Sequence, residues 1–361
     1  MEPADRSVEP ADRSVEPADR SVEPADRSAQ PGGRVGEGVP FRVVGGVVGP
    51  LRVVALGDSV TVGLGDPMPG GGWRGWARLL ADSIGTPGEV ELDNLACSGA
   101  LVRDVLTTQL PRAPALRPTL ATVLVGCNDT LRGRFDLAAV AAGLEEIVTR
   151  LRDAGVLVLT ATLPDPGMML RIPETVRRPL ARRVHAINSV LECVANGRNT
   201  VHVDLAGHPA LYDRRMWGVD RLHPSERGHR LLARQFAGAF GENGVRLRAL
   251  PDPEPANPEP TLWESARWMA TEGTGWVVRR SRDLLPQLTG LVLGEYWHRL
   301  RRRGPALDAR LEAELDAVLR RVCAGPVPCA LRPPQEVSGD VRPDCGRSPR
   351  GCRSTTGLRN T

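Results

Sequence analysis

Four short polar segments of this 361-residue chain carry residue types that could do chemistry together. In order they are Gly57-Asp58-Ser59, Asn94–Gly99, Gly126-Cys127-Asn128-Asp129 and Asp220-Arg221-Leu222-His223-Pro224. A serine hydroxyl is a weak nucleophile unless a base takes its proton and an acid orients that base. The segments supply a serine, an Asp-x-x-His pair and an asparagine amide, a set that allows nucleophilic catalysis at Ser59.

Three of these segments follow apolar runs of strand type. Residues 51–56 lead to Ser59, 90–95 run into the second segment, and 120–125 lead to Asn128. The carboxyl ends of parallel strands meet at one edge of the sheet, where α/β proteins place their chemistry. A late loop, just ahead of the last predicted helix, would bring the Asp-x-x-His pair to the same edge.

Five apolar runs predict the strands of such a sheet. They cover residues 51–56, 90–95, 120–125, 156–161 and 200–205. Helical patterns separate them, which requires right-handed βαβ crossovers and a mostly parallel sheet covered on both faces. The sequence therefore predicts a three-layer α/β/α domain with about five parallel strands over residues 51–243.

Three helical patterns are clear. The first has apolar residues spaced three and four apart over 137–151, with Asp136 as its N-cap and Gly155 as its stop. The second is expected to start after Pro179. The third runs from Ser225 to Phe240 and turns its leucines and phenylalanines inward.

The chain outside this domain has a different composition. Residues 1–50 hold a seven-residue repeat, Glu-Pro-Ala-Asp-Arg-Ser-Val, and a Gly-rich linker. Each repeat has a proline and one sizeable apolar residue, so no coiled-coil seam can form and we expect a disordered tail. Residues 244–260 read as a proline-rich linker, and 323–361 as a second disordered tail.

Residues 261–322 are expected to form a small helical appendage rich in tryptophan and arginine. One interpretation is that it packs on the α/β domain. The other is an amphipathic element at 279–303 that contacts a membrane surface or a partner, because arginines flank the nearly apolar stretch 284–293.

Composition limits the classes of function. A net charge of +4 is too small to argue for nucleic acid. Seven cysteines without a CxxC pair give no zinc spacing and no plain disulfide framework, so Cys97, Cys127 and Cys193 are expected to be reduced core residues. No secretory signal or membrane-spanning run is readable, which predicts a cytoplasmic protein. No cofactor or metal is expected.

Each candidate also has a plainer interpretation. Asp220 and His223 could cap the last helix, and Asn128 could be a turn residue. Asp58 and Asp129 are expected to hold turns, and the two cysteines beside the site to serve packing. The remaining histidines lack metal-ligand spacing and are expected on surfaces or in loops; they are His185, His202, His208, His229 and His298.

Taken together and in this order, the four segments resemble the SGNH hydrolase family, also called GDSL esterases or lipases. The resemblance covers residues 51–241 and extends to Val60-Thr61-Val62-Gly63 after the serine and to Pro224-Ser225 after the histidine. It implies a flavodoxin-like α/β/α domain. A valine follows the serine where the family usually has leucine, a variation away from the reacting atoms.

The resemblance also implies a role for each polar residue. Ser59 would be the nucleophile, His223 the base and Asp220 the acid that orients it. The oxyanion hole would consist of the backbone N–H groups of Ser59 and Gly99 and the side-chain amide of Asn128.

The sequence thus predicts a carboxylic ester hydrolase that works through an acyl-serine intermediate. Its substrate would be a small-molecule ester: a lipid, an acetylated sugar or a short-chain ester. Two alternatives remain open, an acyltransferase that uses the same site and a non-catalytic binding protein that acts through its C-terminal segment.

Overall fold

The computed structural model describes residues 50–170, 172–198, 200–257, 289–290, 293, 297, 301 and 304–323. Most of both predicted tails, and most of the predicted membrane-contact element 279–303, lie outside these residues. No helix in the described ranges is both long and apolar enough to cross a membrane.

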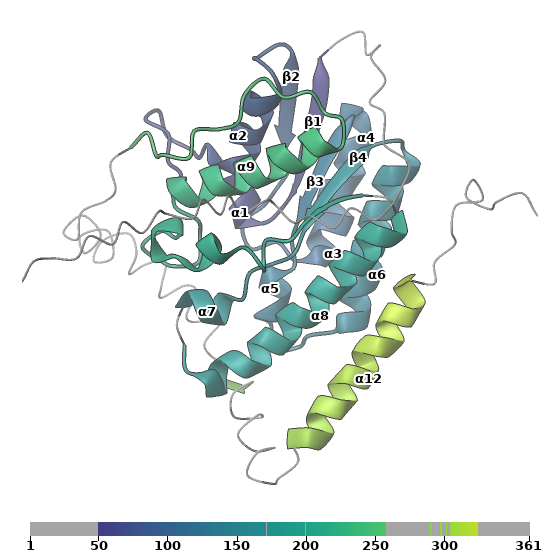
Figure 1. The fold of residues 1–361 in the computed structure, drawn as a ribbon. Helices are drawn as coiled ribbons and strands as arrows, with labels where there is room; N and C mark the ends of the chain where they lie inside the picture. The colour runs from purple at the N-terminus through teal and green to yellow at the C-terminus, as the bar shows by residue number, and fades with distance from the viewer. Residues whose placement is uncertain are drawn as a thin grey trace, which may run out of the picture.

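A five-stranded parallel sheet forms the centre of the molecule (Figure 1). Its strands are β1 (Leu51–Gly57), β2 (Val90–Asn94), β3 (Leu120–Leu124), β4 (Leu157–Ala161) and β5 (Val201–Val203). All neighbouring pairs are parallel, in the order β2-β1-β3-β4-β5. This is the flavodoxin-like order, so the predicted fold and all five predicted strands are confirmed.

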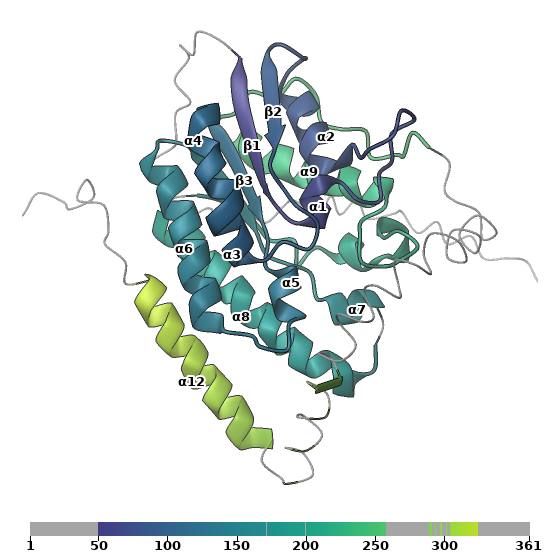
Figure 2. The ribbon, with the colours of Figure 1, turned by 180° about the vertical axis from the view of Figure 1, so that it is seen from behind.

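Helices cover both faces of the sheet (Figures 1 and 2). On one face α2 (Gly75–Ile84) packs against α9 (Glu226–Glu242), and on the other α6 (Leu137–Asp153) packs against α8 (Glu174–Arg198). The segment between β2 and β3 winds through α3 (Val102–Asp104), a π-helical turn (Val105–Gln109), a 3-10 turn (Leu110–Arg112) and α4 (Ala113–Leu116). Three short helices, α1 (Ser59–Val62), α5 (Cys127–Thr130) and α7 (Pro166–Leu170), and two 3-10 turns, Pro209–Tyr212 and Arg214–Met216, complete the described domain.

Two of the predicted helices begin directly after the residues that were predicted to start them. Asp136 accepts the backbone N–H of Ala139 at 2.9 Å and starts α6, and Ser225 accepts that of Gly228 at 3.3 Å and starts α9. The prediction for α8 is wrong at its start, because the helix begins at Glu174 and contains Pro179.

Ion pairs stabilise the turn of α8 that precedes Pro179. Arg177 pairs with Glu174 at 2.5 Å inside that turn and with Asp165 at 3.2 Å outside it. Arg178 pairs with Asp308 at 2.6 Å. These contacts compensate for the backbone hydrogen bond that Pro179 cannot donate.

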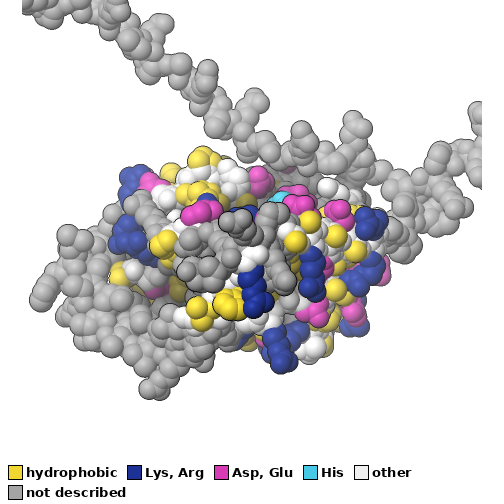
Figure 3. Space-filling view, turned by 90° about the horizontal axis from the view of Figure 1, so that it is seen from below, with side chains coloured by type: hydrophobic (Ala, Val, Ile, Leu, Met, Phe, Trp, Pro, Cys, Tyr) yellow, Lys and Arg dark blue, Asp and Glu magenta, His cyan; other side chains and the backbone are white. Residues whose placement is uncertain are grey.

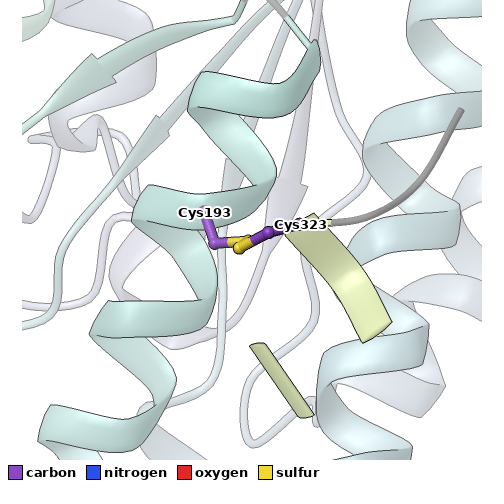
Figure 4. Close-up of a disulfide and its surroundings, with 2 residues drawn as sticks. All are labelled: Cys193 and Cys323. Carbon is purple, nitrogen blue, oxygen red and sulfur yellow. A yellow bond between two sulfur atoms is a disulfide. The ribbon is translucent and has the colours of Figure 1, made fainter. Parts of the chain in front are cut away.

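A further helix, α12 (Gly304–Cys323), packs on the outside of α8 and α6, as Figure 2 shows. It buries Val318 and Val322 against the core, and Cys323 forms a disulfide with Cys193 of α8 (Figure 4). The expectation of a reduced Cys193 is therefore wrong. Cys193 and Cys323 are 130 positions apart, and sequence spacing alone does not reveal that they pair.

The described part of the predicted linker lies against α9. Arg230 and Arg234 donate to the carbonyl oxygens of Asp252 and Pro251, and Arg227 pairs with Glu254 at 2.8 Å. Residues 251–257 are thus fixed along the helix rather than detached from the domain.

His229 contradicts the expectation that the remaining histidines lie on surfaces or in loops. It is fully buried in α9, where its Nδ1 accepts the backbone N–H of Trp76 at 3.2 Å and its Nε2–H donates to the Leu64 carbonyl at 2.9 Å. The acceptor role of Nδ1 requires the neutral ring, and burial lowers the pKa of His229 from 6.5 to about 4.

Because unfolded His229 takes up a proton more readily than native His229, the free energy of unfolding should fall as the pH drops from 6.5 towards 4. His229→Gln keeps an acceptor and a donor but cannot titrate. Its free energy of unfolding should therefore fall by roughly 1–3 kcal/mol less than that of wild type over this range. Urea unfolding at a series of pH values measures both slopes. Exposed His185→Gln is the control, and equal slopes for His229→Gln and wild type would contradict the expectation.

Candidate active site

The carboxyl end of β1 turns sharply to present Ser59. A side chain on Gly57 would lie 2.4 Å from the Leu124 carbonyl of the neighbouring strand, so only glycine fits there. Asp58 then caps α1 by accepting the backbone N–H of Val60 at 3.0 Å, as expected of a turn residue. Ser59, half-buried, is the first residue of that helix.

Gln109 holds the end of β1 in place. Its buried amide accepts the backbone N–H of Gly57 at 2.9 Å and donates to the carbonyl of the same residue at 2.8 Å. Sequence reasoning missed Gln109. No local pattern marked it, because its neighbours Thr107 and Thr108 are also polar.

The structure brings three of the predicted site residues into one chain of hydrogen bonds. The Nε2 of His223 lies 2.9 Å from the Oγ of Ser59, and its Nδ1 lies 2.6 Å from the Oδ2 of Asp220. The side chains of Asp220 and His223 are each 12% exposed, so the pair is largely shielded from solvent. A hydroxyl, an imidazole and a carboxylate in this order can move a proton from the hydroxyl to the ring.

Asp220 also folds the loop that carries the histidine. Its Oδ1 accepts the backbone N–H groups of Leu222 and His223 at 3.0 and 3.1 Å. Burial raises the pKa of Asp220, but hydrogen bonds from His223 and from these two N–H groups outweigh it, and the pKa lies below its usual value. The carboxylate is therefore ionised where it faces the imidazole.

The loop is clamped from both sides. The backbone N–H of Gly218 donates to the His223 carbonyl at 2.8 Å, and Trp217 forms an antiparallel bridge with Pro224. On the other side, Gly65 approaches the Pro224 carbonyl so closely that a Cβ there would lie 1.9 Å from its oxygen. The loop after Ser59 and the loop that carries His223 are thus in direct backbone contact.

The residues predicted to form an oxyanion hole lie at the ends of β1, β2 and β3. The backbone N–H groups of Ser59 and Gly99 have no acceptor in the part of the chain that the structure describes. Gly99 has a φ of 79°, a conformation that favours glycine. The Nδ2 of Asn128 lies 3.2 Å from both the Asp58 carboxylate and the Ala100 carbonyl.

Asp129 supports the loops around these residues. Its Oδ2 accepts the backbone N–H of Val102 at 3.1 Å, which links the end of β3 to the start of α3. Burial raises the pKa of Asp129 to about 6. Its contacts agree with the expectation that Asp129 holds a loop.

A buried charge cluster, which sequence reasoning missed, lies behind the site. It consists of Asp66, Arg74, Glu226 and Arg230. Arg74 bonds to both oxygens of Asp66 at 3.0 and 2.9 Å and to Glu226 at 2.7 Å, and Arg230 bonds to Glu226 at 3.0 Å.

Glu226 also accepts the backbone N–H groups of Ala256 and Asn257. Although burial raises the pKa of Glu226, these N–H groups and the two arginines lower it to about 2. Glu226 therefore stays charged throughout the physiological range, and its ion pair with Arg74 ties the Ser59 loop to the start of α9.

Cys97 and Cys127, which follow β2 and β3, take no part in the disulfide. Cys97 is exposed, contrary to the expectation of a core residue, and its Sγ lies 3.8 Å from the Leu95 carbonyl. Cys127 is half-buried. Among the described residues, no group of three or more His, Cys, Asp or Glu side chains is arranged to hold a metal ion.

Comparison with known proteins places this site in a family. The model of the GDSL-like lipase/acylhydrolase family matches residues 55–231, a range that contains every predicted site residue. An acetylxylan esterase from Geobacillus stearothermophilus is 26% identical over 55% of this chain and 97% of its own length. A GDSL-like esterase of Mycobacterium tuberculosis, Rv1075c, is 28% identical over 51% of this chain and 59% of its own length.

Among solved structures, the lipase/acylhydrolase from Enterococcus faecalis is similar at 23% identity, with a TM-score of 0.43 over 57% of this chain and all of that one. The family model, the two esterases and the flavodoxin-like sheet agree with the resemblance seen in the four polar segments. Residues 55–231 of this chain therefore form a carboxylic ester hydrolase domain of the GDSL-like lipase/acylhydrolase family.

Proposed function

We propose that the protein cleaves esters through an acyl-serine intermediate formed on Ser59. The observation that carries this proposal is the hydrogen-bond chain from Ser59 through His223 to Asp220, at 2.9 and 2.6 Å. Both distances are within the range in which a base can take a proton directly. No rearrangement of the described residues is needed before the first step.

In that step the Oγ of Ser59 attacks the ester carbonyl while its proton passes to the Nε2 of His223. Asp220, ionised and bonded to the Nδ1, holds the ring in the tautomer that accepts this proton and stabilises the imidazolium that forms. When the tetrahedral intermediate collapses, His223 returns the proton to the leaving alcohol. Water then attacks the acyl-serine with the same base, and free Ser59 is restored.

The oxyanion of each tetrahedral intermediate would be bound by three donors. The N–H groups of Ser59 and Gly99 are available because nothing in the described structure accepts from them. The Nδ2 of Asn128 is the third donor, and it would share a hydrogen now directed at Asp58 or Ala100. Preorganised donors of this kind stabilise the developing charge without reorganisation during the reaction.

The relatives support a small acyl group on a polar alcohol. One of them is named an acetylxylan esterase, and this chain spans nearly its whole length. We therefore propose acetyl and other short-chain esters, including acetylated sugars, as the first substrates to test.

The proposed nucleophile is tested with a fluorophosphonate probe, which reacts only with an activated serine. We expect one adduct, located by peptide mass spectrometry on Ser59, and hydrolysis of 4-nitrophenyl acetate that Ser59→Ala abolishes. A folded wild-type protein with no adduct on Ser59 would refute the proposal. Ser98→Ala, which changes a serine outside the hydrogen-bond chain, should label as wild type does.

Removing the Asn128 amide should slow the chemical step. Asn128→Ala deletes one oxyanion donor, which typically costs about 3 kcal/mol, or about 10²-fold in kcat. Steady-state kinetics on 4-nitrophenyl acetate measure the loss, and fluorophosphonate labelling with far-UV circular dichroism shows whether the fold persists. If folded Asn128→Ala keeps the wild-type kcat, the amide is a turn residue and not an oxyanion donor.

A further inference from the structure

A shallow hollow, open to solvent, lies beside the loop that carries His223. It is lined by Met169, Tyr212, Arg214, Trp217 and Arg221. Arg221 stands two positions before His223, and the backbone of Trp217 pairs with Pro224 immediately after it. Two of the five lining residues thus belong to the loop that carries the proposed base, whereas Gly99 and Asn128 follow other strands.

Two guanidinium groups in this hollow carry no counter-charge. Neither Arg214 nor Arg221 has a hydrogen bond or ion pair from its side chain in the described structure. Neighbouring arginines behave differently: Arg215 pairs with Asp213 at 2.8 Å and Arg227 with Glu254 at 2.8 Å. Figure 3 shows basic and acidic side chains interspersed on the face of the molecule seen from below.

The aromatic residues of the hollow have their polar atoms occupied elsewhere. The indole N–H of Trp217 donates to the Leu211 carbonyl at 2.5 Å, and the Tyr212 hydroxyl donates to the Ala206 carbonyl at 2.8 Å. Among the lining side chains, the two guanidinium groups therefore carry the polar atoms that are not engaged elsewhere. Two unengaged guanidinium groups in one hollow suit an anionic group.

The backbone at Arg221 supports a binding role. Its φ is 55°, a left-handed conformation that costs a residue other than glycine roughly 1–2 kcal/mol. The two bonds from Asp220 to the next backbone N–H groups hold the turn in place. Such a conformation at an active-site loop is an observation that motivates a functional role for the side chain.

We propose that this hollow is a subsite for an anionic group, a carboxylate or a phosphate, on the alcohol half of the ester. The inference rests on the proposed function, in which His223 returns a proton to the leaving alcohol. The alcohol must then lie on the His223 side of Ser59, and Arg221 belongs to the loop that carries His223. Guanidinium groups bind carboxylate and phosphate oxygens through paired, charge-assisted hydrogen bonds.

A matched substrate series tests the subsite. The 3-O-acetyl esters of methyl glucoside, of the corresponding glucuronic acid and of the corresponding 6-phosphate differ only at the sixth carbon. We expect wild-type kcat/KM to be about tenfold higher for at least one anionic ester than for the neutral one, and the ratio to shrink with added salt. Comparing kcat/KM of the glucuronic acid ester with that of the 6-phosphate ester shows which anion is preferred.

Variants connect the preference to the hollow. Arg221→Gln and Arg214→Gln should each reduce the anionic-to-neutral ratio several-fold, and Arg214→Gln does so without touching the left-handed turn. Arg215→Gln, which removes a paired arginine outside the hollow, should leave the ratio as in wild type.

The outcomes separate this inference from the proposed function. Hydrolysis of 4-nitrophenyl acetate with equal, or no, turnover of the three sugar esters would reject the subsite alone. A preference that survives both glutamine variants would reject it as well. Absence of any ester hydrolysis together with no fluorophosphonate adduct on Ser59 would reject the proposed function, and the subsite with it.

Discussion

The site depends on one buried constraint, the charge cluster of Asp66, Arg74, Glu226 and Arg230. Ser59 and His223 are 164 residues apart, so their hydrogen bond requires two distant loops to be held together. Arg74 follows the Ser59 loop and Glu226 begins α9 directly after the His223 loop, and the two side chains join at 2.7 Å. Buried charges are costly unless each is paired, so a shift of either loop would leave a charge without its partner. The cluster therefore penalises displacements that would separate the serine from the histidine.

Backbone packing adds a second constraint in the same place. The Cα atoms of Gly63 and Gly75 face each other so closely that a side chain on either would lie within 2.8 Å of the other's Cα. Gly75 starts α2, whose Trp76 packs edge-to-face on Phe236 of α9 with ring centroids 4.7 Å apart. His229 joins the same two segments through Trp76 and Leu64. The loop after Ser59 is thus held to α9 by charge, by close backbone contact and by a neutral histidine.

These constraints explain what the sequence could and could not predict. The strands and the segments after them were predicted because apolar runs and their order are local properties of the chain. The start of α8 before Pro179 was not, because ion pairs to Asp165 and Asp308 stabilise that turn. The pairing of Cys193 with Cys323 and the burial of His229 likewise depend on residues far away in the sequence. Local patterns therefore predicted the three residues that the structure joins in one hydrogen-bond chain, while the groups that hold them together are long-range partners.

The two halves of the site differ in how fully they are prepared for the reaction. The bonds of His223 are short and the Asp220 carboxylate is ionised, so the proton transfer that we propose would need no rearrangement of these residues. The amide of Asn128 instead makes two contacts at 3.2 Å, longer than a typical N–H···O bond of about 2.9–3.0 Å. Hydrogen bonds of this length hold the amide in position, but little bonding energy is lost when a charged oxygen accepts its hydrogen instead. In our proposal, Asn128 would therefore bind the tetrahedral oxyanion more strongly than the neutral ester carbonyl, and only such a difference accelerates the chemical step.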